Sequence, residues 1–410
     1  VLTIAAATES VNFSGNLNAN GDVATLGSIT TSAAMFSDAG GVTPAVAGDT
    51  LDSLFNGAGV SLFNLGDVLT FTGVTRGGAE LPDTTFEIGA ANTTDSDAFG
   101  TTVSDLMAFM QSITGIDATQ PGTPGVAITA GGEIQITGNL GTANAIDLET
   151  TDIIVNQGTT NGQPFSWTNA QDATGESVRT TFVAYDSLGT PMEIDLTMVL
   201  EDASNAGTTW RYYTHAQEDT DLDIFMGSGT LQFDTNGQFV AANNPTFTID
   251  RNNTGALSPQ PITLQFSDTF GAVTALADRE SRLSSTSQDG TPIGTLADFS
   301  ISEDGTIVGV FSNSLLRDLG RIPLATFSNN EGLLEVGGNL YSNTSNSGTP
   351  QIVSPGAGGA GRVIGRAVEL SNVDLAKEFI NLISAQTGFS ANSRVISTSD
   401  QLIQQLLQTI

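Results

Sequence analysis

Residues 371–410 keep one hydrophobic repeat of seven up to the final residue. Apolar side chains recur seven residues apart at Leu375, Leu382, Phe389, Ile396, Ile403 and Ile410. A second series follows four residues after each of the first five, at Phe379, Gln386, Ser393, Asp400 and Leu407. This alternation of four and three residues predicts a coiled-coil-type α-helix with one apolar seam, whose natural partner is another helix.

The predicted helix has a start that can be read from the sequence. Ser371 or Asn372 can cap its free amides, and Asp374 suits the positive end of the helix dipole. Two interpretations fit the pattern: an amphipathic helix that lies on its own domain, or a helix that packs against other chains. The polar residues of the second series favour assembly, because such residues fix the register between helices.

Charge limits the partners of the chain and differs along its length. The net charge is −32, from 44 acidic and 12 basic side chains, which argues against binding to nucleic acid or to an anionic membrane. Residues 1–178 carry 19 acids and one base, residues 179–278 carry 13 and 3, and residues 279–410 carry 12 and 8. Because like charges resist close packing, the nearly balanced last third is the expected assembly interface.

The composition predicts β-structure with many tight turns, since 46 glycines stand against 13 prolines and only 14% of residues are charged. Cysteine is absent, so disulfides and thiolate metal sites are excluded. No apolar run is long enough for membrane insertion, and the first residues do not form a signal peptide. Because no Met opens the chain, we expect the sequence to start inside a longer protein.

The expected architecture is mainly β, with several sandwich-like or barrel-like β-domains in tandem, an inserted outer domain and the long C-terminal helix. Residues 1–19 and 161–280 are expected to form a middle β-domain, and 20–160 an acidic insert that is β-rich with one helix. Residues 281–365 are expected to form an inner β-domain that includes a flexible Gly/Ser-rich passage over 341–365. Residues 366–410 complete the chain as the helix.

Local signals support several of these elements. The insert helix is expected over 101–114, where Thr102 and Asp105 are spaced as a capping box. Residues 126–138 have the alternation of a hairpin with Gly131-Gly132 at its turn. Asp304-Gly305 marks a second hairpin, in the expected inner domain. Residues 362–370 alternate as a strand would.

Sites for catalysis, cofactors or metals are not supported by the motifs present. Residues 356–361 match the glycine pattern of a dinucleotide site through Gly356, Gly358, Gly359 and Gly361, but no opening helix follows, so a hinge or turn is expected. The sole histidine, His215, lacks a nucleophile motif nearby. Asp219, Asp221 and Asp223 could hold a hard cation, yet without the rest of an EF-hand loop a solvated acidic turn is favoured.

The C-terminal sequence resembles a known family. Residues 368–407, VELSNVDLAKEFINLISAQTGFSANSRVISTSDQLIQQLL, are similar to the C-terminal helix of bacterial flagellar rod and hook proteins. Residues 284–348, 7–19 and 177–200 resemble the hook members of this family. The resemblance covers about two thirds of the chain and is weakest over 20–160. The N-terminal helix that pairs with the C-terminal one in this family is missing from the chain.

The resemblance implies a structural subunit and no enzyme. Such a subunit polymerises into a curved, flexible tube outside the cell, which acts as a universal joint and transmits torque from the rod to the filament during motility. Implied partners are copies of the chain itself, the distal rod, the hook–filament junction proteins and, during assembly, the hook cap. The implied route is type III export without a cleaved signal peptide, and no cofactor is implied.

If the chain is such a subunit, we expect the helix seam to hold neighbouring subunits together. The assembly residues are expected to be Leu375, Phe379, Leu382, Phe389, Ile396, Ile403, Leu407 and Ile410. The passage over 341–365, with its four hinge glycines, is expected to absorb bending together with the junctions near 161–165 and 280. Two alternatives remain open. The chain could be a distal-rod protein, which forms a straight, stiff shaft, or a secreted β-rich adhesin or enzyme.

Overall fold

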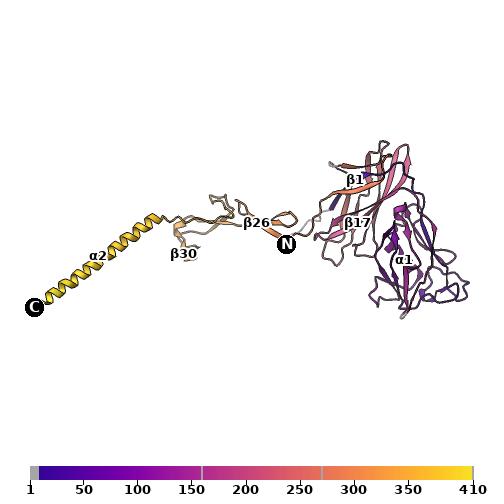
Figure 1. Ribbon diagram of the computed structural model, residues 1–410, viewed down its shortest axis with the longest axis horizontal. Helices are drawn as coiled ribbons and strands as arrows, with labels where there is room; N and C mark the ends of the chain where they lie inside the picture. The colour runs from indigo at the N-terminus through magenta and orange to yellow at the C-terminus, as the bar shows by residue number, and fades with distance from the viewer. Residues whose placement is uncertain (1–8, 158–159, 269–270, 409–410) are drawn as a thin grey trace. The chain divides into compact units, whose positions relative to one another are not determined.

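The computed structural model describes residues 9–157, 160–268 and 271–408. The chain divides into two compact units, one that ends at Ile293 and one that starts at Gly294. Most elements are β-strands in several separate sheets, and one long helix closes the chain, as Figure 1 shows. The expected mainly β class with a long C-terminal helix is therefore confirmed.

The first unit contains a β-sandwich. One sheet has the order β21-β22-β1-β24-β23, and β25 pairs with β1 on its other edge. Its strands are β1 (Glu9–Asn16), β21 (Thr246–Ile249), β22 (Gln260–Gln265), β23 (Ser267–Asp268), β24 (Gly271–Thr274) and β25 (Arg282–Gln288). The second sheet is an antiparallel meander of β16 (Ser177–Tyr185), β17 (Pro191–Ser204), β18 (Gly207–Ala216), β19 (Phe225–Phe233) and β20 (Phe239–Asn243).

Both sheets bury alternate side chains in one core. Phe13 of β1 lies at its centre, with its ring centroid 5.2 Å from that of Phe182 on the opposite sheet. Trp210 and Tyr212 of β18 are also almost fully buried there. The alternation of apolar and polar residues in 9–17 therefore directs the apolar side chains of β1 into this core. Strand β1 itself pairs with β22 and with β25.

A second core lies under the remaining strands of the first unit. These strands are β2 (Gly27–Ser32), β3 (Met35–Phe36), β4 (Phe55–Asn56), β5 (Val68–Phe71), β6 (Thr75–Arg76), β7 (Ala79–Glu80), β8 (Thr84–Ile88), β9 (Ala98–Gly100), β10 (Gly125–Ile128), β11 (Ile134–Leu140), β12 (Ile146–Asp147), β13 (Ile153–Gln157), β14 (Thr160–Gly162) and β15 (Trp167–Gln171). Short 3-10 turns lie at Leu51–Ser53 and Thr142–Asn144. The larger sheets are β10-β11-β2-β15 and β14-β13-β5-β8-β9.

Helix α1 (Val103–Thr114) packs its apolar face into this core. The predicted capping box is confirmed, because the Asp105 amide donates to Thr102 Oγ1 over 3.2 Å and the Thr102 amide donates to Asp105 Oδ2 over 2.9 Å. Gly115, with φ of 63°, ends the helix in the left-handed conformation that glycine adopts without strain. Val103 and Phe109 are among its buried residues.

The second unit is thin and buries little. Its strands are β26 (Leu296–Ile301), β27 (Thr306–Phe311), β28 (Leu316–Arg321), β29 (Leu324–Thr326), β30 (Leu334–Gly337), β31 (Leu340–Ser342) and β32 (Gln351–Val353), with a 3-10 turn at Asn330–Gly332. Strands β26, β27 and β28 form one sheet, and the predicted turn at Asp304-Gly305 joins the first two. Helix α2 (Leu375–Gln408) ends the described chain. No helix in the described ranges is long and apolar enough to cross a membrane.

Two expected boundaries and one expected strand differ from the structure. Trp167 packs in the core of the insert and β15 pairs with β2, so the insert extends beyond residue 160. Strand β25 pairs with β1 in the first unit, although residues from 281 onward are assigned to the inner domain by the sequence. Residues 362–370 form no strand. The sequences of β15 and β25 contain no local signal for the strand with which each one pairs. The division into four domains otherwise stays a prediction.

Candidate assembly interface

Helix α2 begins at a different cap from the one expected. The Asp374 Oδ1 atom accepts from the amides of Ala376 over 2.9 Å and Lys377 over 3.3 Å, so Asp374 is the N-cap. Ser371 instead accepts from the Val373 amide over 3.2 Å, in a turn before the helix. The prediction of Ser371 or Asn372 as the cap is therefore wrong, because the carboxylate that directly precedes the first helical residue is nearer the free amides.

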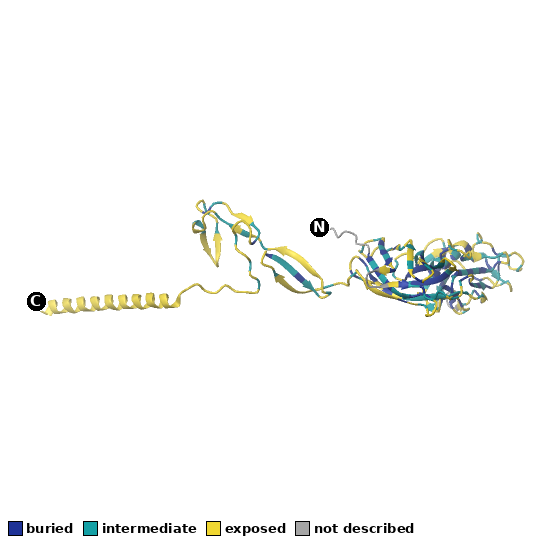
Figure 2. Ribbon diagram, turned by 90° about the horizontal axis from the view of Figure 1, so that it is seen from above, coloured by how far each residue is buried: buried dark blue, intermediate teal, exposed yellow. Residues whose placement is uncertain are grey.

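Every residue of α2 that the structure describes is exposed, as Figure 2 shows along the whole helix. The predicted assembly residues in this range are between 59% (Ile403) and 75% (Phe389) exposed. They are Leu375, Phe379, Leu382, Phe389, Ile396, Ile403 and Leu407. Ile410 lies outside the described residues. The structure brings none of these side chains into a buried contact, so their role in assembly stays a prediction.

The apolar surface of α2 is broader than the predicted seam. Five more apolar residues are at least 61% exposed: Ile380, Ile383, Val395, Leu402 and Leu406. At about 100° per residue, the apolar residues of 375–383 and those of 395–407 centre on faces that differ by roughly 150°. The seven-residue spacing hides this rotation, which the 3.6-residue period of the helix reveals when each half is considered alone. The helix therefore presents two apolar faces, one in each half.

A polar section of the helix separates these faces. Gly388 lies in it, in a helix interior, where glycine is unfavourable by about 1 kcal/mol relative to alanine. The Thr387 hydroxyl donates to the carbonyl of Ile383 over 2.7 Å, a contact that often bends helices. Both features are expected to make the middle of α2 less stable than a helix of alanine.

The predicted hinge glycines form a hydrogen-bonded loop. Gly356, Gly358 and Gly359 have φ angles of 77°, 60° and 81°, which side chains rarely allow. The Gly356 amide donates to the Gly361 carbonyl over 2.9 Å and closes the loop. The neighbouring β32 pairs with β29, so part of the predicted flexible passage lies in a sheet. Bending at this loop stays a prediction.

Two ion pairs attach the segment after this loop to the β26–β27 hairpin. Arg362 Nη1 lies 3.0 Å from Glu303 Oε2, and Arg366 Nη2 lies 2.6 Å from Asp298 Oδ2. A backbone bond from Val363 to Glu303, 3.1 Å long, supports the first pair. All four charged side chains are more than 60% exposed, so each pair contributes at most about 1 kcal/mol. The attachment is weak enough to open without unfolding the sheet.

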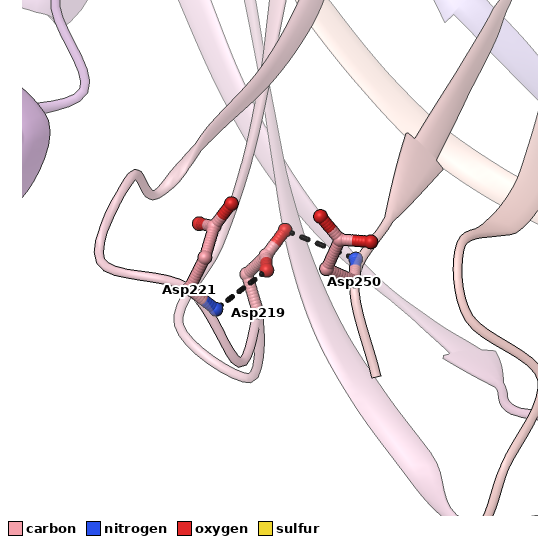
Figure 3. Close-up of side chains that lie close together, drawn as sticks. All are labelled: Asp219, Asp221 and Asp250. Atoms are coloured by element: carbon pink, nitrogen blue, oxygen red, sulfur yellow. Dashed lines mark hydrogen bonds between the residues drawn. The ribbon is translucent and has the colours of Figure 1, made fainter. Parts of the chain in front are cut away.

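The acidic turn is organised differently from the pattern considered in the sequence. Asp219 and Asp221 have carboxylate oxygens within 4.8 Å of each other and of Asp250, whereas Asp223 is not part of the group (Figure 3). Asp219 accepts from the amides of Asp221 over 3.1 Å and Asp250 over 3.3 Å, and burial raises its pKa to about 6. These bonds explain the grouping as a folded turn. A cation is not required to hold it.

Comparison with known proteins gives two family matches. Residues 365–409 match the C-terminal domain of the flagellar basal body rod FlgEFG proteins, and residues 148–291 match the D2 domain of the flagellar basal body protein FlaE. The second match includes β25, in agreement with the pairing of this strand with β1, but it also includes β15, which pairs with β2 in the insert. The first includes α2. Over these two ranges the chain is similar to flagellar rod and hook proteins.

Its curated relatives include flagellar hook proteins. The chain is 36% identical over 232 residues to the flagellar hook protein FlgE of Helicobacter pylori, which is 54% of this chain and 31% of that protein. It is 34% identical over 250 residues to FlgE of Escherichia coli, which is 60% of this chain and 58% of that protein. The chain thus spans less than two thirds of either relative.

Structural likeness to solved hook proteins is low. The Helicobacter pylori hook protein FlgE2 aligns with 84% of this chain and 73% of its own at 17% identity, with a TM-score of 0.29. A 32 kDa fragment of the Caulobacter crescentus hook protein aligns with 68% of this chain at 12% identity, with a TM-score of 0.26. These values support no residue-level comparison.

Proposed function

We propose that the chain is a structural subunit of the bacterial flagellar hook that polymerises into a curved, flexible tube. The observation that carries this proposal is α2, a helix of 34 residues whose large apolar side chains are all exposed. A monomer in water would hide such a surface, since each fully buried apolar side chain contributes about 1.5–3 kcal/mol. The hook proteins among the relatives of this chain support the same function.

In this proposal the tube transmits torque as a universal joint. Neighbouring copies are held through the α2 seam, the glycine loop of 356–361 absorbs bending, and the acidic first unit lies toward solvent. The tube lies outside the cell between the distal rod and the hook–filament junction proteins, under the hook cap while it grows. We also propose that the chain is exported without a cleaved signal peptide.

The seam is tested by the double substitution Leu382→Asp and Ile396→Asp in the full-length protein. These side chains are 61% and 64% exposed, so covering them contributes about 1–2 kcal/mol each. Burying two carboxylates in their place costs more. A loss of at least about 3 kcal/mol per subunit raises the critical concentration for polymerisation more than about a hundredfold. Sedimentation and electron microscopy measure this change.

A matched control adds the same charge on the polar sides of the two helix halves, with Asn381→Asp and Gln401→Asp. Both residues are exposed and lie opposite the apolar face of their own half. We expect normal tubes from this control and none from the seam variant, with the β-domains of both folded by circular dichroism. Tubes from the seam variant, or equal loss in both, contradict the proposal.

The distal-rod alternative is not favoured, because the match over 365–409 is to a domain that rod and hook proteins share and the relatives described above are hook proteins. The two candidates differ in the shape of the polymer. Electron micrographs of the assembled full-length protein show a curved tube if the chain is a hook subunit and a straight shaft if it is a rod subunit.

A further inference from the structure

The first unit ends in a short segment, residues 289–293, which connects β25 to the start of the second unit at Gly294. We call it the exit segment. Its residues are exposed apart from the half-buried Gly290, and even the apolar side chain of Ile293 is 66% exposed. The exit segment therefore gains little from burial, and its position depends on polar contacts.

Hydrogen bonds hold the exit segment at its two ends. The Asp289 amide donates to the Ser10 carbonyl over 3.2 Å, and the Ser10 amide donates to Asp289 Oδ1 over 2.7 Å. The Ile293 amide donates over 3.2 Å to the carbonyl of Gly189, in the turn between β16 and β17. Water competes for both partners of an exposed hydrogen bond, so each one contributes little. The segment can therefore open locally while the two sheets stay folded.

The side chain of Glu9 lies under the exit segment. It is 4% exposed, and both of its carboxylate oxygens accept from the Tyr185 amide. Gly290 covers this carboxylate so closely that an added Cβ atom would lie 2.2 Å from Glu9 Oε1. The same Cβ would lie 3.2 Å from Cδ2 of Tyr185. A glycine is therefore required here for the segment to close, and its departure opens the carboxylate to water.

The charges that face Glu9 are mainly negative. Burial raises its pKa to about 7, and Asp289 of the exit segment and Asp186 of the β16–β17 turn raise it further, against the opposing hydrogen bond from Tyr185. The nearby cation is Arg251, which is paired with Asp186 over 3.2 Å. An ionised Glu9 is therefore buried beside two other carboxylates. Departure of the exit segment relieves both the burial and the repulsion from Asp289.

We propose that Glu9 and the exit segment form a pH-sensitive latch, in which the protonated carboxyl group holds the segment closed and its ionisation favours release. The closed segment keeps the proton on Glu9, because it shields the carboxyl group from water and brings Asp289 close. Release returns Glu9 to water and leaves 289–293 as free chain before the second unit. The proposal does not depend on assembly of the chain.

The sign and size of the effect follow from linkage. Closure raises the pKa of Glu9 above its ordinary value of 4.5, so the contribution of Glu9 to closure is complete below pH 4.5 and is lost as the pH rises to about 7. Between pH 6 and pH 8 the ratio of released to closed segment should increase about tenfold.

Hydrogen exchange of the full chain, measured by mass spectrometry, tests this increase. Peptides that cover 286–294 report on the Asp289 and Ile293 amides, and each rate is divided by the intrinsic rate at the same pH. We expect their protection to fall about tenfold from pH 6 to pH 8. It should stay at least tenfold below that of the Leu17 amide, which donates to the Thr274 carbonyl in the sandwich. Equal protection would mean that the segment opens only when the unit unfolds, which overturns the proposal.

Two variants decide whether Glu9 is the cause. Glu9→Gln keeps an acceptor for the Tyr185 amide and removes the charge, so protection of 286–294 should agree within twofold at pH 6 and pH 8. Gly290→Ala places a methyl group against the carboxylate and should lower this protection at least tenfold already at pH 6. Gly320→Ala is the matched control, because its added Cβ meets no atom within 4 Å, and it should stay within twofold of the parent. A parent-like pH dependence in Glu9→Gln, or parent-like protection in Gly290→Ala, overturns the proposal.

Discussion

Glu9 makes the stability of the first unit depend on pH in a direction opposite to that of most carboxylates. It is 4% exposed on β1, and both of its carboxylate oxygens accept from the Tyr185 amide, over 2.9 and 2.8 Å. Burial raises its pKa from 4.5 to about 7, with further upward contributions from Asp289 and Asp186. The substitution Glu9→Gln removes the charge and keeps an acceptor for the amide.

The sign follows from the raised pKa in the folded state. The folded protein holds the Glu9 proton more tightly than the unfolded chain, so the contribution to stability is complete below pH 4.5 and is lost as the pH rises to about 7. The penalty in the parent protein is about 1 kcal/mol at pH 5 and about 3 kcal/mol at pH 8. The stability of Glu9→Gln relative to the parent should therefore increase by about 2 kcal/mol between these pH values.

Urea unfolding measures this difference through tryptophan fluorescence in a Trp167→Phe background, in which the signal comes from Trp210, buried in the same core as β1. The control is Val11→Ala on the same strand, which removes buried methyl groups and no titratable group. It should destabilise the unit by a similar amount at pH 5 and pH 8. If the relative stability of Glu9→Gln is equal at both pH values, or falls toward pH 8, the assignment of a buried, protonated Glu9 is wrong.

Three further substitutions test contacts elsewhere. Arg251→Met leaves the buried carboxylate of Asp186 without its cation, 3.2 Å away, and should lower the free energy of unfolding by about 3–5 kcal/mol, measured in urea. Asp374→Ala removes the cap of α2 and should destabilise that helix by about 1 kcal/mol, seen as fraying of its first turn by NMR. Gly207→Ala should prevent normal folding of the β17–β18 hairpin, because the added Cβ would lie 1.9 Å from the Phe233 carbonyl oxygen at a φ of 125°; an unchanged melting temperature contradicts this.

Local signals were sufficient to predict some elements from the sequence. The capping box of Thr102 and Asp105 is predicted correctly, because both partners lie within one turn of the helix. The Asp304-Gly305 turn is also predicted correctly, since Gly305 has the positive φ of 80° that such turns require. In both places, the residues that decide the conformation are the residues that adopt it.

Contacts between distant segments could not be predicted in this way. Strand β25 is polar, with Ser284, Ser285 and Ser287 paired to β1 through backbone bonds that show no side-chain preference. Its partner lies more than 260 residues earlier in the chain. Trp167 likewise has an apolar side chain that fits either core, and its pairing through β15 assigns it to the insert.

The burial of Arg76 shows a similar limit, although one sequence signal was available. Arg76 is the one base among the first 178 residues, which carry 19 acids. A cation in such surroundings would form surface ion pairs, yet Arg76 is buried beside Asp195, from a different sheet. The sequence alone shows that Arg76 is an isolated base among acidic residues. Only the fold shows that Arg179 shares its carboxylate.

The two apolar faces of α2 bear on the proposed tube. On a straight helix a seven-residue repeat drifts by about 20° per repeat, so from Leu375 to Ile403 the seam alone turns by roughly 80°. The additional residues Leu402 and Leu406 turn the apolar surface further, to roughly 150° between the halves. A single straight partner helix cannot cover both faces. A closed layer of helices, in which each one has neighbours on two sides, covers both, and the weak middle around Gly388 lets the two halves adjust separately as the tube bends.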